Sequence, residues 1–204
     1  MENNPLSATT ELHNVSTHPP LEPPALNRWI VEKIESYILR PTLEMNSGFG
    51  SISAELAEKA IPIRLSDQNK SNRDQLRQRF KGIEAIRRVY NIDFCHPEFE
   101  SFYSEALGCF GTLIALNVLE NGYYDSLALR NARHFLRPRG RLILIAPAYT
   151  SIFCGLDEDP TSWQHFNFQA LKNLLKHDFE IITTHYLNLT SPLGLSVLAV
   201  ARRI

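Results

Sequence analysis

The sequence predicts an α/β fold in three layers: a doubly wound, mostly parallel sheet of seven strands with helices on both faces. Short apolar runs typical of buried strands alternate with segments whose apolar residues have helical spacing, which is the pattern of a covered parallel sheet. The last two apolar runs are joined only by residues 186–194. Because this connection is too short for a helical crossover, we expect an antiparallel strand at the end of the sheet.

The first half of the chain starts with apolar residues at helical spacing, among them Trp29, Ile30 and Ile34, and Pro41 blocks this helix from continuing. A short apolar run then leads into a glycine-containing turn at 46–50, and the strand–helix pattern repeats after it. The expected elements are helices at 25–39, 51–59 and 72–80 and strands at 42–45, 61–66 and 86–92.

The second half contains the two most apolar runs, GTLIALN and RLILIA, which suit central buried strands. Between them lies a helical pattern that ends before a turn at Pro138, Arg139 and Gly140. The expected elements are strands at 111–117, 141–146, 179–185 and 195–201 and helices at 125–136 and 168–176.

The composition indicates one domain with an N-terminal arm. The 204 residues suit a single domain at 25–204, and residues 1–24 hold five prolines and no apolar periodicity, which predicts a flexible arm. The sequence shows no pattern of a signal peptide and no apolar run long enough to span a membrane. Its three cysteines are too scattered for a disulfide scaffold, so we expect a cytoplasmic protein. The net charge of −1 argues against a nucleic-acid partner, although it does not exclude a local basic groove.

Polar side chains follow four successive strands. Glu44 ends the first strand before Asn46, Ser47, Gly48 and Gly50, while Asp67, the pair Asp93 and Phe94, and Asn117 follow the next three strands in order. The carboxyl ends of the strands are where open α/β sheets bind ligands, and a carboxylate after the second strand suits a ribose diol. Glycines and acids also mark ordinary turns, but four such strand ends in the right order outweigh that interpretation.

Taken together, these segments resemble class I S-adenosylmethionine-dependent methyltransferases of the small-molecule type, over residues 25 to 204. The segments that carry the resemblance are LEMNSGFGS, IRLSDQN, YNIDF, LIALNVLEN, RHFLRPRGRLILIAPAY and LNRWIVEKI. The sequence departs from the family's pattern at Asn46, where a glycine is usual, at Asn121, where a histidine is usual, and at Arg139, where a second glycine is usual. The resemblance implies the Rossmann-like methyltransferase fold.

The resemblance also implies S-adenosylmethionine as the cofactor. It assigns Asp67 to the ribose and Asp93 to the region of the adenine amino group. Trp29 lies against the methionine end of the cofactor or is only a core anchor of its helix. The full set expected to bind the cofactor is Glu44, Asn46, Ser47, Gly48, Gly50, Asp67, Gln68, Asp93, Phe94, Asn117 and Trp29.

Methyl transfer from a sulfonium needs positioning more than it needs a nucleophile or a metal. His165 is the candidate general base, since an imidazole titrates near neutral pH, although a surface-loop role is the simpler interpretation. The residues expected to line the acceptor pocket are Glu120, Tyr149, Trp163 and Phe166. No pair of histidines has the spacing of a metal site, so we expect no metal.

We therefore expect transfer of a methyl group to a small molecule, as O- or C-methylation in a secondary-metabolite or a lipid or quinone pathway. The alternative is a degenerate member of the fold, either a cyclase-like enzyme or a cofactor-binding regulatory protein, because Asn46 and Asn121 alter the pattern. A protein or RNA methyltransferase fits less well, since no N-P-P-Y or D-P-P-Y follows the fourth strand. A homodimer is left open.

Overall fold

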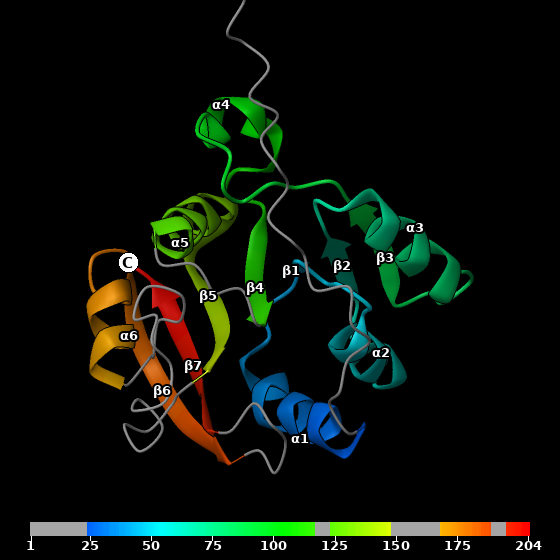
Figure 1. Cartoon of the computed structure of the whole chain (residues 1–204), viewed down its shortest axis with the longest axis horizontal. Coiled ribbons are helices and arrows are strands. Elements are labelled where there is room, and N and C mark those ends of the chain that lie inside the picture. The colour runs from blue at the N-terminus through cyan, green and yellow to red at the C-terminus, as the bar shows by residue number, and fades with distance from the viewer. Residues whose placement is uncertain (1–23, 117–122, 148–167, 189–194) are drawn as a thin grey trace, which may run out of the picture.

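The protein is described by a computed structural model that covers residues 24–116, 123–147, 168–188 and 195–204 (Figure 1). The strands are β1 Thr42–Met45, β2 Ile63–Ser66, β3 Ile86–Tyr90, β4 Phe110–Leu116, β5 Leu136–Pro147, β6 Phe179–Asn188 and β7 Leu195–Arg203. The α-helices are α1 Pro24–Ile34, α2 Ser51–Glu58, α3 Lys70–Arg79, α4 Phe99–Phe102, α5 Tyr123–Phe135 and α6 Phe168–Leu175. Two 3₁₀ turns, η1 Glu35–Tyr37 and η2 Ser104–Ala106, complete the elements of this part of the chain.

The strands form one seven-stranded sheet in the order β3-β2-β1-β4-β5-β7-β6. The pairs among β1 to β5 are parallel, whereas β7 runs antiparallel to both β5 and β6. The predicted doubly wound sheet with an antiparallel end is therefore confirmed. The strand order reverses between β1 and β4, so their carboxyl ends flank the point where such folds bind ligands.

Two hydrophobic clusters hold helices to the two faces of the sheet. Along β4, Leu113 and Ala115 belong to the cluster under α4, α5 and α6, while Ile114 belongs to the cluster under α1, α2 and α3. Along β5, Leu142 and Ile143 divide in the same way, because successive side chains of a strand point to opposite faces. In Figure 1 these two sets of helices lie on opposite sides of the sheet, which gives the expected three layers.

The main difference from the sequence-based expectations lies between β3 and β4. No helix is expected there from the sequence, but α4 and η2 occupy this connection, and Phe99 of α4 is only 2% exposed. Its ring contacts Phe94 and Phe135 at centroid distances of 5.7 and 4.7 Å. A single turn of helix has too few residues to show a period, so its stability depends on tertiary contacts such as those of Phe99.

The turn expected at Pro138 to Gly140 is present, but it lies inside β5. The pairing of β4 with β5 jumps from Phe110↔Leu136 to Thr112↔Arg141, so the residues between them bulge from the ladder. Arg139 has φ +62°, and a Cβ on Gly140 would lie 2.8 Å from the carbonyl oxygen of Arg137. The structure thus places Arg139 in the left-handed region, which explains why a glycine is usual at this position.

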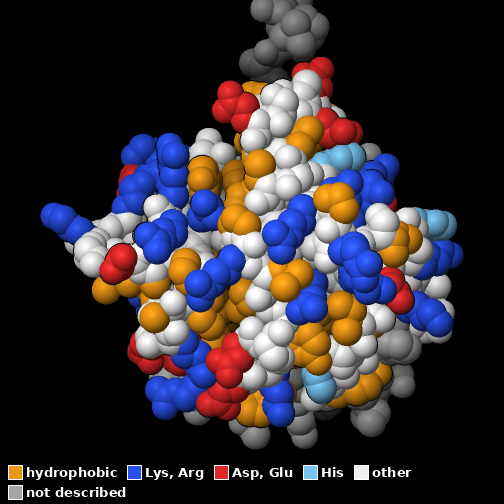
Figure 2. All heavy atoms as spheres, turned by 180° about the vertical axis from the view of Figure 1, so that it is seen from behind, with side chains coloured by type: hydrophobic (Ala, Val, Ile, Leu, Met, Phe, Trp, Pro, Cys, Tyr) orange, Lys and Arg blue, Asp and Glu red, His pale blue; other side chains and the backbone are white. Residues whose placement is uncertain are grey.

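The near-zero net charge hides an uneven surface. Figure 2 shows Lys and Arg side chains spread over the middle of the face seen from behind, with most Asp and Glu side chains toward its margins. Arginines lie near the amino ends of two neighbouring strands, at Arg64 in β2 and at Arg87 in β3.

Replacing Arg139 with glycine is expected to stabilise the fold. Glycine adopts φ +62° without the steric cost that an L side chain bears, so Arg139→Gly should raise the free energy of unfolding by about 1 kcal/mol. Urea unfolding followed by circular dichroism measures the change. Arg137→Ala, which alters an exposed arginine of the same strand, is the control. A less stable Arg139→Gly protein would contradict the strain at this position.

Candidate functional site at the carboxyl ends of the strands

The turn after β1 is built from three residues with positive φ. Asn46, Gly48 and Gly50 have φ values of +46°, +52° and +74°. A Cβ on Gly50 would lie 2.6 Å from the ring of Phe80, so this position requires glycine. Asn46 occupies a position where the family's pattern has glycine, and asparagine is one of the few residues that adopts this conformation readily. The departure at Asn46 is therefore compatible with the turn.

Hydrogen bonds join this turn to the end of β2. The amide of Ser47 donates to the carbonyl of Ser66 over 2.8 Å, and the hydroxyl of Ser66 donates to the carbonyl of Glu44 over 2.8 Å. The amide of Gly50 then donates to the carbonyl of Ser47 over 2.8 Å, and α2 begins at the next residue with its first amides directed toward the turn. Glu44, Ser47, Gly48 and Gly50 thus lie together, as the sequence predicts.

Asp67 is the carboxylate that holds the turn in place. It is 2% exposed and accepts hydrogen bonds from the amide of Gly48 at 3.0 Å, the amide of Asn69 at 2.8 Å and the side-chain nitrogen of Asn72 at 3.1 Å. A carboxylate has about four acceptor positions. Three are filled from within the chain, so about one position remains open to a further donor.

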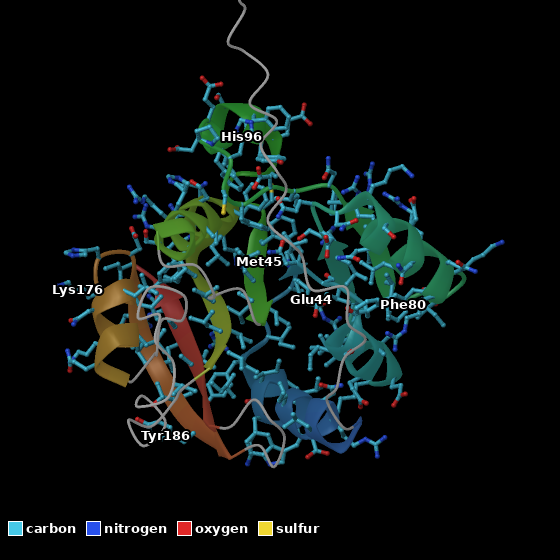
Figure 3. All side chains as sticks on the ribbon, viewed as in Figure 1. Glu44, Met45, Phe80, His96, Lys176 and Tyr186 are labelled. Atoms are coloured by element: carbon cyan, nitrogen blue, oxygen red, sulfur yellow. The ribbon has the colours of Figure 1, made fainter. Side chains whose placement is uncertain are left out.

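Glu44 is the second buried carboxyl of the site, at 3% exposure. The hydroxyl of Ser53, from the first turn of α2, donates to its Oε2. Burial raises the pKa of Glu44 from 4.5 to about 7, the negative charge of Asp67 adds to the rise, and hydrogen bonds from Ser53 and Ser47 oppose it. In Figure 3, Glu44 lies between Met45 and Phe80, on the side of β1 that faces α2 and α3.

Arg73, which the sequence analysis did not select, joins the ends of β2 and β3. Its Nη1 donates to the carbonyls of Asp67 and Gln68 at 3.0 and 2.7 Å and to Oδ1 of Asn91 at 2.9 Å. Gln68 itself is exposed. The only sequence signal is an arginine in the first turns of the helix that follows Asp67, which does not by itself indicate these partners.

The residues after β3 have different environments. Oδ1 of Asp93 accepts from the amide of Cys95 at 2.8 Å, and the amide of Asp93 lies 2.9 Å from the hydroxyl oxygen of Tyr103. Phe94 is 3% exposed, and its ring packs against Phe99 and Phe135 at 5.7 Å from each. The Phe94 ring is therefore part of the hydrophobic core rather than an open aromatic surface at the strand end.

The hydrogen bonds described above do not involve the remaining residues predicted from the sequence. Trp29 of α1 is half-buried against the α1–α3 cluster, with the Nζ of Lys33 5.4 Å from its ring centroid. Six predicted residues lie outside the described residues. They are Asn117, Glu120, Tyr149, Trp163, His165 and Phe166.

The described part of the chain holds neither a candidate metal cluster nor a membrane-spanning helix. Among its residues, no three His, Cys, Asp or Glu side chains are grouped so as to hold a metal ion. No helix within the same ranges is long and apolar enough to cross a membrane.

Comparison with solved structures identifies the fold. A SAM-dependent methyltransferase from Methanosarcina mazei superposes with a TM-score of 0.67 at 17% identity, over 84% of this chain and 97% of that chain. Magnesium protoporphyrin IX methyltransferase from Synechocystis with bound SAH gives 0.64 at 18% identity, over 88% and 80%. The [4+2]-cyclase SpnF gives 0.67 at 13% identity, over 86% and 81%. No protein-family model matches the sequence, and no curated protein does either.

These similarities show that the chain has the Rossmann-like fold of class I S-adenosylmethionine-dependent methyltransferases. The resemblance found in the sequence motifs is thereby confirmed at the level of the fold. At these identities, the comparison establishes the architecture and leaves the reaction to be inferred from the site.

The raised pKa of Glu44 predicts a specific pH dependence of stability. Between pH 4.5 and about 7 the folded protein holds a proton on Glu44 that the unfolded chain has lost, so the free energy of unfolding falls as pH rises through this window. The corresponding loss is about 3 kcal/mol, and it is complete above the folded pKa. In Glu44→Gln this contribution is absent, so the variant should gain stability relative to the wild type between pH 5 and pH 8.

Urea unfolding at several pH values measures this difference. Glu58→Gln, which changes an exposed glutamate of α2, should follow the wild-type profile. Parallel profiles for Glu44→Gln and the wild type would show that the Glu44 carboxyl is ionised in the folded protein throughout.

Proposed function

We propose that this protein is an S-adenosylmethionine-dependent methyltransferase that acts on a small-molecule acceptor. The observation that carries the proposal is the turn between β1 and α2, held by Asp67 at the point where the strand order reverses. This point is the ligand-binding position of doubly wound folds, and the fold is shared with solved methyltransferases.

The residues of the site fit this cofactor. Gly48 has φ +52° and no atom closer than 4.0 Å to a Cβ built on it, so the backbone there is open to a ligand. Glu44 is a buried carboxyl whose pKa of about 7 leaves it ready to ionise beside a positive group, and the cofactor carries an ammonium and a sulfonium. The sulfonium supplies the methyl group and the driving force for its transfer.

In this proposal the cofactor contacts are the set selected from the sequence, apart from the ring of Phe94, which packs in the core. Asp67 lies toward the ribose and Asp93 toward the adenine. Arg73 and Asn72 join them as residues that position Asp67 and the neighbouring strand ends. We retain His165 as the base, and Glu120, Tyr149, Trp163 and Phe166 as acceptor-pocket residues, on the sequence argument alone. These residues would orient the acceptor and exclude water while the methyl group moves in line from sulfur.

The second candidate function is a protein of the same fold that does not methylate, either a cyclase or a cofactor-binding regulator. The similarity to the cyclase SpnF, with a TM-score of 0.67, supports it to the same degree as the methyltransferase similarities. Binding of S-adenosylmethionine does not separate the two, because both candidates retain the cofactor site.

Two measurements test the proposal in sequence. Isothermal titration calorimetry with S-adenosylmethionine and S-adenosylhomocysteine should show saturable binding, and each ligand should raise the melting temperature. Incubation with methyl-labelled cofactor and a panel of phenols, carboxylic acids and activated carbon acids should then give a labelled product. Absence of cofactor binding would overturn the proposal, and binding without transfer across the panel would favour the second candidate.

Asp67→Asn is expected to weaken the binding of S-adenosylhomocysteine by about 1–3 kcal/mol, since hydrogen bonds to a charged acceptor are lost. Calorimetry on the folded variant measures the change. Asp74→Asn is the matched control, because Asp74 is an exposed carboxylate of α3 that pairs with Lys70 and Arg77. Equal affinities for the two variants would remove Asp67 from the binding site.

A further inference from the structure

A hollow of about 440 Å³ lies at the opposite edge of the sheet from the candidate site. It is formed where β5 begins and β7 ends, two positions that the antiparallel pairing brings together through Arg141↔Arg202. The residues that line it are Pro138, Arg139, Glu180, Arg202, Arg203 and Ile204. Its volume falls within the range of small-molecule sites, which is roughly 300–1,000 Å³.

The lining of this hollow carries excess positive charge. Glu180 forms an ion pair with Arg202, which leaves Arg139 and Arg203 without an acidic partner in the described part of the chain. Asp178, whose charge acts on Arg203, pairs with Arg133 at 3.3 Å. The hollow is therefore lined by three arginines and one glutamate, and Arg139 and Arg203 form no ion pair among the described residues.

Arg203 lies close to a backbone carbonyl and to a second arginine. Its Nη1 donates to the carbonyl of Leu136, which orients the guanidinium at the start of β5. Burial and the nearby Arg133 lower the pKa of Arg203, while Asp178 opposes the shift only weakly. An anion placed in the hollow would relieve this repulsion.

Arg139 adds an independent observation. Its φ of +62° is a conformation that costs an L side chain free energy and that glycine adopts freely. The chain nevertheless carries an arginine here, at a residue that lines the hollow. Backbone strain of this kind is typically retained at functional positions, so we attribute the arginine to ligand binding rather than to a requirement of the fold.

We propose that this hollow binds the phosphate group of a small molecule, through the guanidinium groups of Arg139 and Arg203. The planar fork of arginine matches the geometry of phosphate and forms paired, charge-assisted hydrogen bonds with it. A doubly charged group neutralises both unpaired guanidiniums, which a single carboxylate does not. The site is separate from the proposed cofactor site, so it stands whether or not the chain transfers methyl groups.

The test measures melting temperature against ligand concentration, with sodium chloride at equal ionic strength as the reference. Inorganic phosphate and glycerol 3-phosphate are the two probes. We expect a saturable rise in melting temperature with at least one of them in the wild-type protein. A stronger effect of glycerol 3-phosphate identifies a phosphate ester as the ligand class, whereas equal effects identify free phosphate.

Arg139→Gly separates this proposal from a structural role of the arginine. The variant should melt at a higher temperature than the wild type without phosphate, yet its affinity for the probe should fall by roughly tenfold or more, as expected when charge-assisted hydrogen bonds are lost. Arg203→Lys, which keeps the charge and loses the fork, should also weaken binding. Arg137→Ala, an exposed arginine of the same strand outside the hollow, should retain it.

Two results would overturn the proposal. One is a wild-type protein that responds to phosphate no more than to chloride at the same ionic strength. The other is an Arg139→Gly protein that responds to the probe as the wild type does.

Discussion

The hydrogen bond from the amide of Gly48 to the carboxylate of Asp67 is the interaction on which the carboxyl edge of the sheet depends. It joins the turn after β1 to the end of β2, and the same carboxylate receives Asn69 and Asn72 from the start of α3. A charged acceptor with three donors stabilises a geometry more than neutral pairs do. One buried side chain thus links the ends of β1 and β2 to the start of α3.

Much of the fold could be predicted because its central strands are continuous apolar runs. Residues such as Ile114 and Ile143 are buried on one face and Leu113 and Leu142 on the other, so composition alone identifies β4 and β5. The single turn of α4 could not be predicted in this way. Phe99 stabilises it through ring contacts with Phe94, in the loop just before it, and with Phe135 of α5, which is distant in the sequence.

The candidate site was predictable in its positions and less so in its chemistry. Asp67 and Gly48 stand out in the sequence at strand ends, but nothing there shows that they bond to each other across 19 positions. Phe94 follows Asp93 at a strand end, yet its ring turns into the core. The pKa of Glu44 depends on complete burial beside Ser53, which requires α2 to be packed in place.

That protonated Glu44 has a consequence for any cationic ligand. Below pH 7 the carboxyl holds a proton that a neighbouring positive charge would expel, so association would release a proton to the buffer. The measured heat of association would then change with the ionisation enthalpy of the buffer, and the affinity would rise with pH up to the folded pKa. A buried acid at the end of β1 therefore links ligand capture to the acidity of the surrounding solution.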